Sequence, residues 1–142
     1  MVLNPPEGLP RVIPYLLYND VDAALEWLTG TCGFSVQFRM PGPDGKAMHA
    51  EVALNGGVVM LGNPGSDYQN PTKRGGVTQI TYVYVDDVDA HCQNAKRAGA
   101  TVIRELADQF YGDRTYAVED PEGHHWQFSQ HVRDVAPEDM HP

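Results

Sequence analysis

The chain has 142 residues, of which 42% are hydrophobic and 20% are charged, and its formal net charge at pH 7 is −9. This length and composition are typical of one globular domain with a sizeable core. The negative charge argues against nucleic acid as a partner, because the phosphate backbone would repel the protein; it suits a cationic ligand, or simply keeps the protein in solution.

An internal repeat organises the sequence. The segment Ile13–Ala23 returns as Ile80–Ala90, at an offset of 67 residues. Because most solenoid repeats are shorter, this repeat predicts one closed domain built from two equivalent modules with a site between them. Within this single domain we place module one at about residues 11–63, a polar connector at 64–76, module two at about 77–130 and a loose C-terminal tail at 131–142.

Module one is predicted to fold as a strand, a helix and three further strands. Residues 11–18 are rich in β-branched and aromatic side chains, which favour a strand, and Asn19 and Asp20 supply an N-cap for the helix. The helix should end at Gly30 and Gly33. Its apolar face comprises Val21, Ala24, Leu25 and Leu28. Strands are then expected at residues 34–40, 47–54 and 58–62.

Module two repeats this order. The apolar face of its helix comprises Val88, Cys92 and Ala95, and residues 98–100 stop it. His91 lies at the edge of that face and is expected to be a partly exposed packing residue. Further strands are predicted at residues 101–106, 115–119 and 125–129, with a turn at 120–123.

The sequence also bears on where the protein resides and on the redox state of its two cysteines. No apolar stretch is long enough to span a bilayer, and the first residues lack the basic and apolar segments of a signal peptide. We therefore predict a cytoplasmic protein with no membrane partner. Cys32 and Cys92 share no metal-type spacing, so we expect two reduced packing residues rather than a disulfide.

Together these features resemble the vicinal oxygen chelate superfamily, which contains glyoxalase I, bleomycin-resistance proteins, fosfomycin-resistance enzymes and extradiol dioxygenases. The resemblance rests on two βαβββ modules, on Asp-Val-Asp-Ala at each helix start, and on the Asp-Pro-Glu-Gly turn within Asp120–Phe128. It implies an α+β fold in which two tandem βαβββ modules form a half-open mixed β cup with helices outside.

Enzymes of this superfamily hold one divalent metal with His or Glu side chains from four strands. By the resemblance, the corresponding positions here are Ile13, Met60, Ile80 and Gln127. Divalent metals of this kind favour oxygen or imidazole ligands, which two isoleucines, a thioether and a neutral amide do not supply. We therefore predict no metal and no cofactor. A relocated metal site that includes His49 and Glu51, two residues apart on one strand face, is the alternative.

Strand alternation predicts the lining of the cup. By alternation, Tyr15, Tyr82 and His125 are candidate ligand-binding residues, and Leu17, Tyr84 and Ser129 should project to the same side. The resemblance adds Met60, Glu119 and Gln127 to the candidate ligand-binding residues, and it adds Thr115 and Ala117 to the lining. Each of these residues could instead be a packing residue that fills the interior, and Glu119 could instead be a charge that faces outward. Trp126 and Phe128 alternate to the other side and should anchor the helices.

Three functions remain open, and no catalytic residue can be assigned. The favoured one is a glyoxalase/bleomycin-resistance-like protein that binds a small aromatic or cationic molecule in a metal-free cup, as a homodimer. The second is a lyase, isomerase or dioxygenase-type enzyme, with relocated metal ligands or with acid–base chemistry through Glu119, His125 or tyrosines. The third is a catalytically silent structural relative. The modules pair either within one chain or between two chains.

Overall fold

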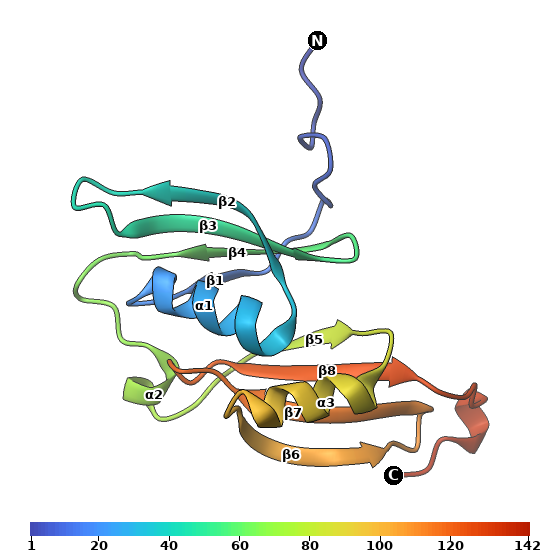
Figure 1. The fold of residues 1–142 in the computed structure, drawn as a ribbon. Helices are drawn as coiled ribbons and strands as arrows, with labels where there is room; N and C mark the ends of the chain where they lie inside the picture. Colours follow the sequence, from blue (N-terminus) through green and yellow to red (C-terminus); the bar gives the residue numbers. More distant parts are fainter.

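The computed structural model describes all residues, Met1–Pro142, and arranges them in two four-stranded sheets (Figure 1). In module one the sheet order is β1 (Tyr15–Leu17), β4 (Gly57–Gly62), β3 (Ala47–Leu54) and β2 (Ser35–Pro41). In module two it is β5 (Ile80–Tyr84), β8 (His125–His131), β7 (Asp113–Glu119) and β6 (Thr101–Asp108).

The two sheets have the same topology. In each, the first strand pairs in parallel with the last, and the other neighbours pair antiparallel. In each sheet, the edge strand farthest from this parallel pair is β2 or β6. In the chain, this strand comes directly after the helix of its module. The predicted α+β fold of two tandem βαβββ modules, with open sheets, is confirmed.

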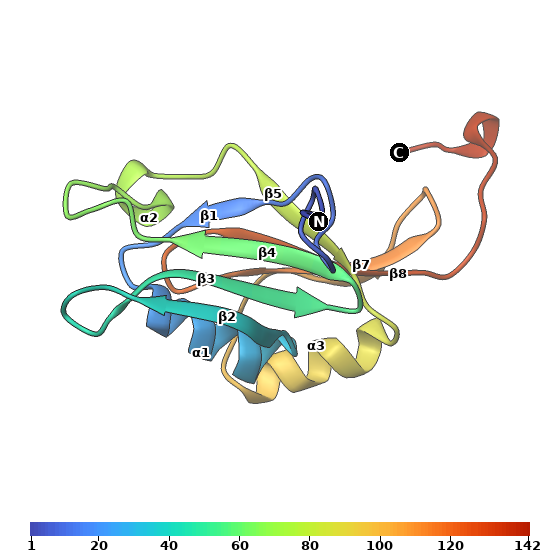
Figure 2. The same cartoon turned by 90° about the horizontal axis from the view of Figure 1, so that it is seen from above.

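Both long helices form where the sequence predicts them. The helix α1 (Val21–Cys32) begins after Asp20, whose side chain accepts a hydrogen bond from the backbone N–H of Ala23 at 3.0 Å. The helix α3 (Val88–Arg97) begins after Asp87, which caps Ala90 in the same way. Every residue of the two predicted apolar faces is buried. Seen from above, α1 and α3 lie on the same side of the molecule, whereas β1 and β5 lie on the opposite side (Figure 2).

The structure differs from the sequence prediction in several strand boundaries and in two short helices that the sequence did not predict. Strand β1 begins at Tyr15 rather than at residue 11, because Pro14 has no N–H to donate to a ladder. The connector contains a short helix, α2 (Pro71–Arg74), that the predictions omitted. The tail contains a 3₁₀ helix, η1 (Pro137–Asp139). No helix in the structure combines the length and the apolar character that crossing a membrane requires.

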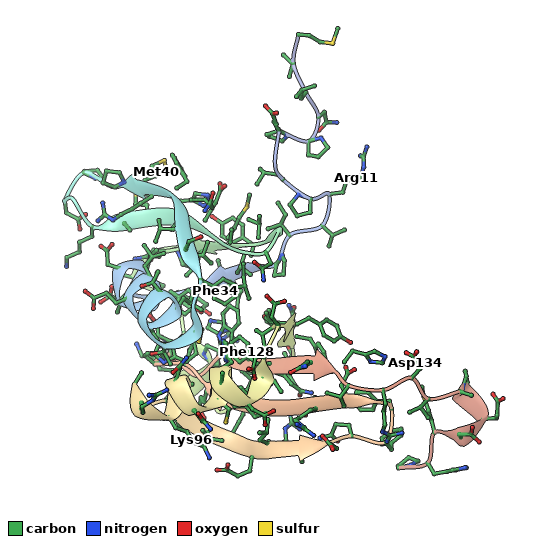
Figure 3. The ribbon with its side chains drawn as sticks, turned by 45° about the vertical axis from the view of Figure 1, so that its right-hand side comes forward. Arg11, Phe34, Met40, Lys96, Phe128 and Asp134 are labelled. Carbon is green, nitrogen blue, oxygen red and sulfur yellow. The ribbon has the colours of Figure 1, made fainter.

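One hydrophobic core runs through both modules. It contains 20 buried residues, and α1 contacts α3 within it. Trp126 of module two is fully buried, and its ring centroid lies 5.7 Å from that of Phe34 and 6.3 Å from that of Trp27, both in module one. Phe34 and Phe128 both lie where the modules meet (Figure 3). Trp126 and Phe128 therefore point to the helix side, as predicted.

The Asp-Pro-Glu-Gly turn joins the modules by hydrogen bonds. Tyr18 and Trp126 both donate to the same carboxylate oxygen of Asp120, at 2.6 and 3.1 Å. Glu122 accepts from the backbone N–H groups of Asn19 and Asp20, at 2.7 and 2.8 Å. The turn that carries the family resemblance is thus a docking element between the modules.

His91 adds a second polar link on the helix side. Its Nε2 donates to the backbone oxygen of Cys32 at 2.7 Å, which leaves Nδ1 to accept from the Tyr116 hydroxyl at 2.5 Å. Burial lowers the pKa of His91. The expected packing role is confirmed, and Cys32 and Cys92 are both buried free thiols.

Candidate functional site

Each sheet has one face covered by helices and one open face. In module one, alternation buries Val52 and Leu61 against the helix side and leaves Tyr15 on the open face, 52% exposed. In module two, Tyr116 and Phe128 point to the helix side, whereas Tyr82 and Tyr84 stand on the open face, 41% and 58% exposed. Other large side chains exposed on the open faces are Phe38, Met40 and Ile80. Exposed aromatic surface of this kind is typical of sites that bind a ligand or another protein.

The six predicted ligand-binding residues form three pairs across neighbouring strands. Tyr15 lies opposite Met60, Tyr82 lies opposite Gln127, and Glu119 lies opposite His125. The first pair stands on the open face of module one, and the other two share the open face of module two. Gln127 also accepts a hydrogen bond from Arg104 at 3.3 Å. No hydrogen bond links the open face of one module to that of the other.

The open face of module one has a hydrogen-bonded chain of three side chains. The Tyr15 hydroxyl lies 2.8 Å from His49 Nδ1, and His49 Nε2 lies 3.1 Å from a Glu51 carboxylate oxygen. Gly62 makes this reach possible, because a Cβ there would lie 2.6 Å from the Tyr15 ring and hydroxyl. The Tyr15 side chain thus reaches His49 because it packs against a glycine.

The open face of module two is organised by Asp113, which is only 3% exposed. Tyr82 and Tyr84 donate their hydroxyl protons to the same Asp113 oxygen, Oδ2, at 2.5 and 2.8 Å. His131 Nδ1 donates to Oδ1 at 2.8 Å, and its Nε2 lies 2.7 Å from Asp134. We call Asp113, Tyr82, Tyr84 and His131 the Asp113 cluster.

The charge states of the cluster follow from these contacts. Burial raises the pKa of Asp113, but hydrogen bonds from Tyr82, His131 and Tyr84 outweigh it and hold that pKa below its ordinary value. Burial first, and then Asp113, raises the pKa of Tyr82; the hydrogen bond to Asp113 is the main cause that raises the pKa of Tyr84. At neutral pH the cluster therefore combines an ionised carboxylate with two neutral phenols.

Two clefts flank the region where β1 and β5 approach each other, and the internal repeat relates them. The first, of about 380 Å³, has a largely polar lining that includes Tyr15, Tyr68, Arg74, Thr81, His124 and His125. The second, of about 400 Å³, has a largely apolar lining that includes Pro14, Phe34, Leu54, Val58, Tyr82 and Tyr84. The first cleft brings Tyr15 and His125 together from different modules.

Sequence reasoning missed the Asp113 cluster. Asp113 lies two residues before Thr115, so alternation along β7 places both on the open face. That signal was available, but the predicted strand began at Thr115 and excluded Asp113. The contact with His131 could not be found this way, because it depends on the pairing of Asp113 with His131 between β7 and β8.

The structure contains no group of three or more His, Cys, Asp or Glu side chains arranged to hold a metal ion. His49 and Glu51 share a face as predicted, without a third ligand. The four positions that correspond to the superfamily's metal ligands carry Ile13, Met60, Ile80 and Gln127, which do not fit a divalent metal that needs oxygen or imidazole donors. The loss of the metal stays a prediction.

Comparisons with known proteins agree with this architecture. A family model described as Glyoxalase/Bleomycin resistance protein/Dioxygenase superfamily matches residues 9–128. Two uncharacterized proteins, from Mycobacterium bovis and Mycobacterium tuberculosis (strain H37Rv), are each 40% identical over 131 residues, which cover 89% of this chain and 86% and 77% of theirs.

Two examples illustrate the similarity to solved structures. TioX from Micromonospora sp. ML1 has a TM-score of 0.72 and 35% identity, with 87% of this chain and 100% of that chain covered. TnmS3, an antibiotic binding protein from Streptomyces sp. CB03234, has a TM-score of 0.62 and 21% identity, with 87% and 98% covered. The likeness to TnmS3 concerns the fold alone.

Proposed function

Because the chain belongs to the glyoxalase/bleomycin resistance protein/dioxygenase superfamily, we propose that it binds a small aromatic or cationic molecule against its open sheet faces. One observation carries the proposal: Tyr82 and Tyr84 are 41% and 58% exposed, yet Asp113 fixes both hydroxyl groups. An aromatic wall whose rings are already held in place loses little entropy when a flat guest stacks on it.

Two further facts support this ligand class. The net charge of −9 favours a cation over an anion. TnmS3, which shares the fold, is an antibiotic binding protein, so this architecture is compatible with holding a small organic compound. We propose that binding needs no metal or cofactor and takes place in the cytoplasm.

We also propose a homodimer. The hydrogen bonds and core contacts between the two modules lie on the helix side and at the Asp120 turn, so neither open face is covered by the other module. Pairing the open face of module one with that of module two from a second copy would close a cup and bury exposed Tyr15, Phe38 and Tyr84. Sedimentation at micromolar concentration should give about twice the chain mass of 15.7 kDa; a monomer would refute the dimer.

Calorimetry with three planar probes of one size tests ligand binding: 9-aminoacridine as the cation, acridone as the neutral compound and anthracene-9-carboxylate as the anion. We expect the cation to bind most tightly. Tyr15→Ala and Tyr82→Ala should each weaken binding by about tenfold with little change in melting temperature. Val36→Ala, on the opposite face, is the control, with Val36 45% exposed.

Two outcomes would contradict the proposal. If none of the three probes binds, the protein is better described as a silent structural relative. If the melting temperatures of the tyrosine variants fall as far as their affinities, the two tyrosines are packing residues rather than ligand contacts.

An enzyme is the second candidate, favoured by the chain that links Tyr15, His49 and Glu51. A carboxylate that orients a histidine next to a reactive hydroxyl is an arrangement suited to general acid–base catalysis. Proton NMR in D₂O with a panel of small carbonyl compounds would detect C–H exchange. Exchange that His49→Gln abolishes and Tyr84→Phe leaves unchanged would favour the enzyme; no exchange with any compound would refute it.

A further inference from the structure

We propose that the Asp113 cluster is a binding site for the hydrogen-bond donor of a ligand, and that it selects protonated amines over carbonyl or carboxylate compounds. The inference rests on the proposed function of the same face and names the chemistry that this face recognises. Asp113 acts as a positioning residue, since the two tyrosines in front of it would touch the ligand.

The direction of the hydrogen bonds decides the selectivity. A phenol has one proton to donate and two lone pairs that accept. Tyr82 and Tyr84 both direct their single proton to Asp113 Oδ2, at 2.5 and 2.8 Å. An ionised carboxylate can only accept, so neither bond can reverse. Neither phenol therefore has a proton left for a ligand, and each phenol oxygen can only accept a further hydrogen bond.

The other oxygen of Asp113 also accepts a hydrogen bond, which further favours the ionised carboxylate. Oδ1 of Asp113 already accepts from His131 Nδ1 at 2.8 Å. A ligand carbonyl or carboxylate would have to draw a tyrosine proton away from a charge-assisted bond, and such bonds are about twice as strong as neutral ones. A ligand ammonium group breaks nothing, and the negative charge behind the tyrosines attracts it.

Polarisation strengthens the same preference. A hydroxyl that donates to a carboxylate carries more negative charge on its oxygen, so it accepts a second hydrogen bond more strongly. The two rings lie with centroids 5.4 Å apart in an edge-to-face arrangement, so one cation can face a ring and a phenol oxygen together.

The equivalent position in module one lacks this fixed polarity. Tyr15 corresponds to Tyr82 through the repeat, but its partner is His49 Nδ1, which donates or accepts according to tautomer. A ligand acceptor or donor at Tyr15 can therefore be accommodated by a tautomer change. The repeat thus supplies a contrast, since Tyr82 is held by a carboxylate and Tyr15 by an imidazole.

Ser129 lies on the same side of the module-two sheet as the two tyrosines of the cluster. It lies opposite Tyr84 in the sheet and is fully buried, and its hydroxyl is the one buried side-chain polar atom in the chain without a hydrogen-bond partner. It lies close enough to the Tyr82 hydroxyl to oppose in part the rise that burial and Asp113 cause in the pKa of Tyr82. Gly62 occupies the corresponding position in module one.

The test uses three probes with one ring system: 1-naphthylmethylammonium, naphthalene and 1-naphthoate, titrated by calorimetry. In the wild type we expect the ammonium to bind at least about tenfold more tightly than the carboxylate. Asp113→Asn should reduce this ratio by about tenfold, because a neutral amide no longer holds both phenol protons. The combined variant Tyr82→Phe with Tyr84→Phe keeps both rings but removes both acceptor oxygens. It should therefore no longer favour the ammonium over the carboxylate, but it should still bind naphthalene. Val36→Ala, on the opposite face of the module-one sheet, is the control and should leave this ratio unchanged.

The outcomes separate this inference from the proposed function. If naphthalene binds the wild type but the ammonium gains nothing over the carboxylate, the acceptor site is refuted and the aromatic wall stands. If the wild type prefers the ammonium over the carboxylate, and the double phenylalanine variant keeps this preference, the preference comes from the general acidity of the protein. The inference is then again refuted. If no probe binds, the proposed function fails and this inference fails with it. Because the double variant leaves Asp113 in place, a folding defect of Asp113→Asn does not remove the test.

Discussion

Trp126 is the residue through which module two packs on module one. Its indole ring contacts Phe34 and Trp27, and its Nε1 donates to the buried carboxylate of Asp120. We expect Trp126→Ala to lower the free energy of unfolding by about 3–5 kcal/mol, because the change leaves a cavity and removes a donor from Asp120. Urea denaturation measures this loss. Val36→Ala should change it by about 0.5 kcal/mol or less; equal losses in both variants would refute the role of Trp126.

Gly62 controls the position of Tyr15 on the open face of module one. A Cβ at residue 62 would meet the Tyr15 ring at 2.6 Å, and because that ring is half exposed it can swing into solvent. Gly62→Ala should therefore break the bond from Tyr15 to His49 and change stability by only about 1 kcal/mol. NMR of the His49 imidazole nitrogens reports the break. Gly57→Ala, where the nearest atom lies at 3.4 Å, should leave the His49 signals in place.

The Asp113 cluster predicts how stability depends on pH. The pKa of Asp113 is lowered on folding, so its contribution is present above its unfolded pKa of about 3.9 and is lost as the pH falls through the folded value. The pKa of His131 is raised by Asp134 and Asp113, so its contribution is present below about 6.5 and is lost as the pH rises through the folded value. The two contributions coexist fully between about pH 4 and 6.5. The difference in melting temperature between wild type and Asp113→Asn should be largest in that window; a difference that does not vary with pH would contradict the assignment.

At the scale of elements, the Asp-Pro-Glu-Gly turn holds the start of α1. The Glu122 carboxylate accepts from the backbone N–H groups of Asn19 and Asp20, and it also accepts from Asn70 of the connector at 3.2 Å. It thereby ties module one, the connector and module two together, next to the positive end of a helix.

Glu122→Ala should loosen this junction. We expect a loss of about 1–3 kcal/mol in the free energy of unfolding, because two backbone donors lose a charged acceptor. Hydrogen exchange of the Asn19 and Asp20 amides should accelerate, whereas the capped Ala90 amide of α3 should be unaffected and serves as the control. Unchanged exchange at both positions would show that water replaces Glu122 without loss.

The elements that the sequence predicts well are those set by local pattern. Apolar periodicity and N-cap residues predict both long helices and their N-caps. Turn residues predict that three strands follow the helix in each module. Alternation also predicted that Tyr15, Tyr82 and His125 share the open faces of their sheets, and their role in binding a ligand stays a prediction. The short helix α2 was missed because four residues in a segment rich in Pro and Gly give no periodic signal.

Contacts between elements that are distant in the chain could not be predicted from the sequence. The Asp113 cluster combines residues from β5, β7 and β8, so it depends on register between strands that are distant in the chain. The packing of Trp126 on Phe34 depends on how the two modules dock. Periodicity within one strand or helix carries no information on either.

At the scale of the whole molecule, one question is whether the two open faces that form a cup come from one chain or from two. Met60 on β4 and Gln127 on β8 occupy equivalent positions of the repeat, and each lies on the open face of its own module. Within the chain the modules meet through their helix sides instead. We therefore expect the cup to combine module one of one copy with module two of the other.

Engineered metal ligands can test both this pairing and the claim that the cup has lost its metal. The four changes Ile13→His, Met60→Glu, Ile80→His and Gln127→Glu, made in one chain, should create two imidazole and two carboxylate ligands with room for water. The buried carboxylates should destabilise the protein without metal, and nickel, zinc or manganese should restore stability by binding only the folded state. Calorimetry and melting curves should show no such effect in the wild type.

Dividing the four changes between two chains then identifies the pairing. One chain would have Ile13→His with Met60→Glu, the other Ile80→His with Gln127→Glu, and differently tagged copies would be co-expressed so that the mixed dimer can be isolated. A cup formed between chains unites all four ligands once per mixed dimer, so the mixed dimer should bind one metal ion while each doubly substituted homodimer binds far more weakly. A cup formed within a chain offers only two ligands per cup in every one of these species, so only the quadruple variant would bind. If the folded quadruple variant itself shows neither heat of binding nor a metal-dependent rise in melting temperature, the four positions do not converge, and the inferred loss of a metal site is wrong.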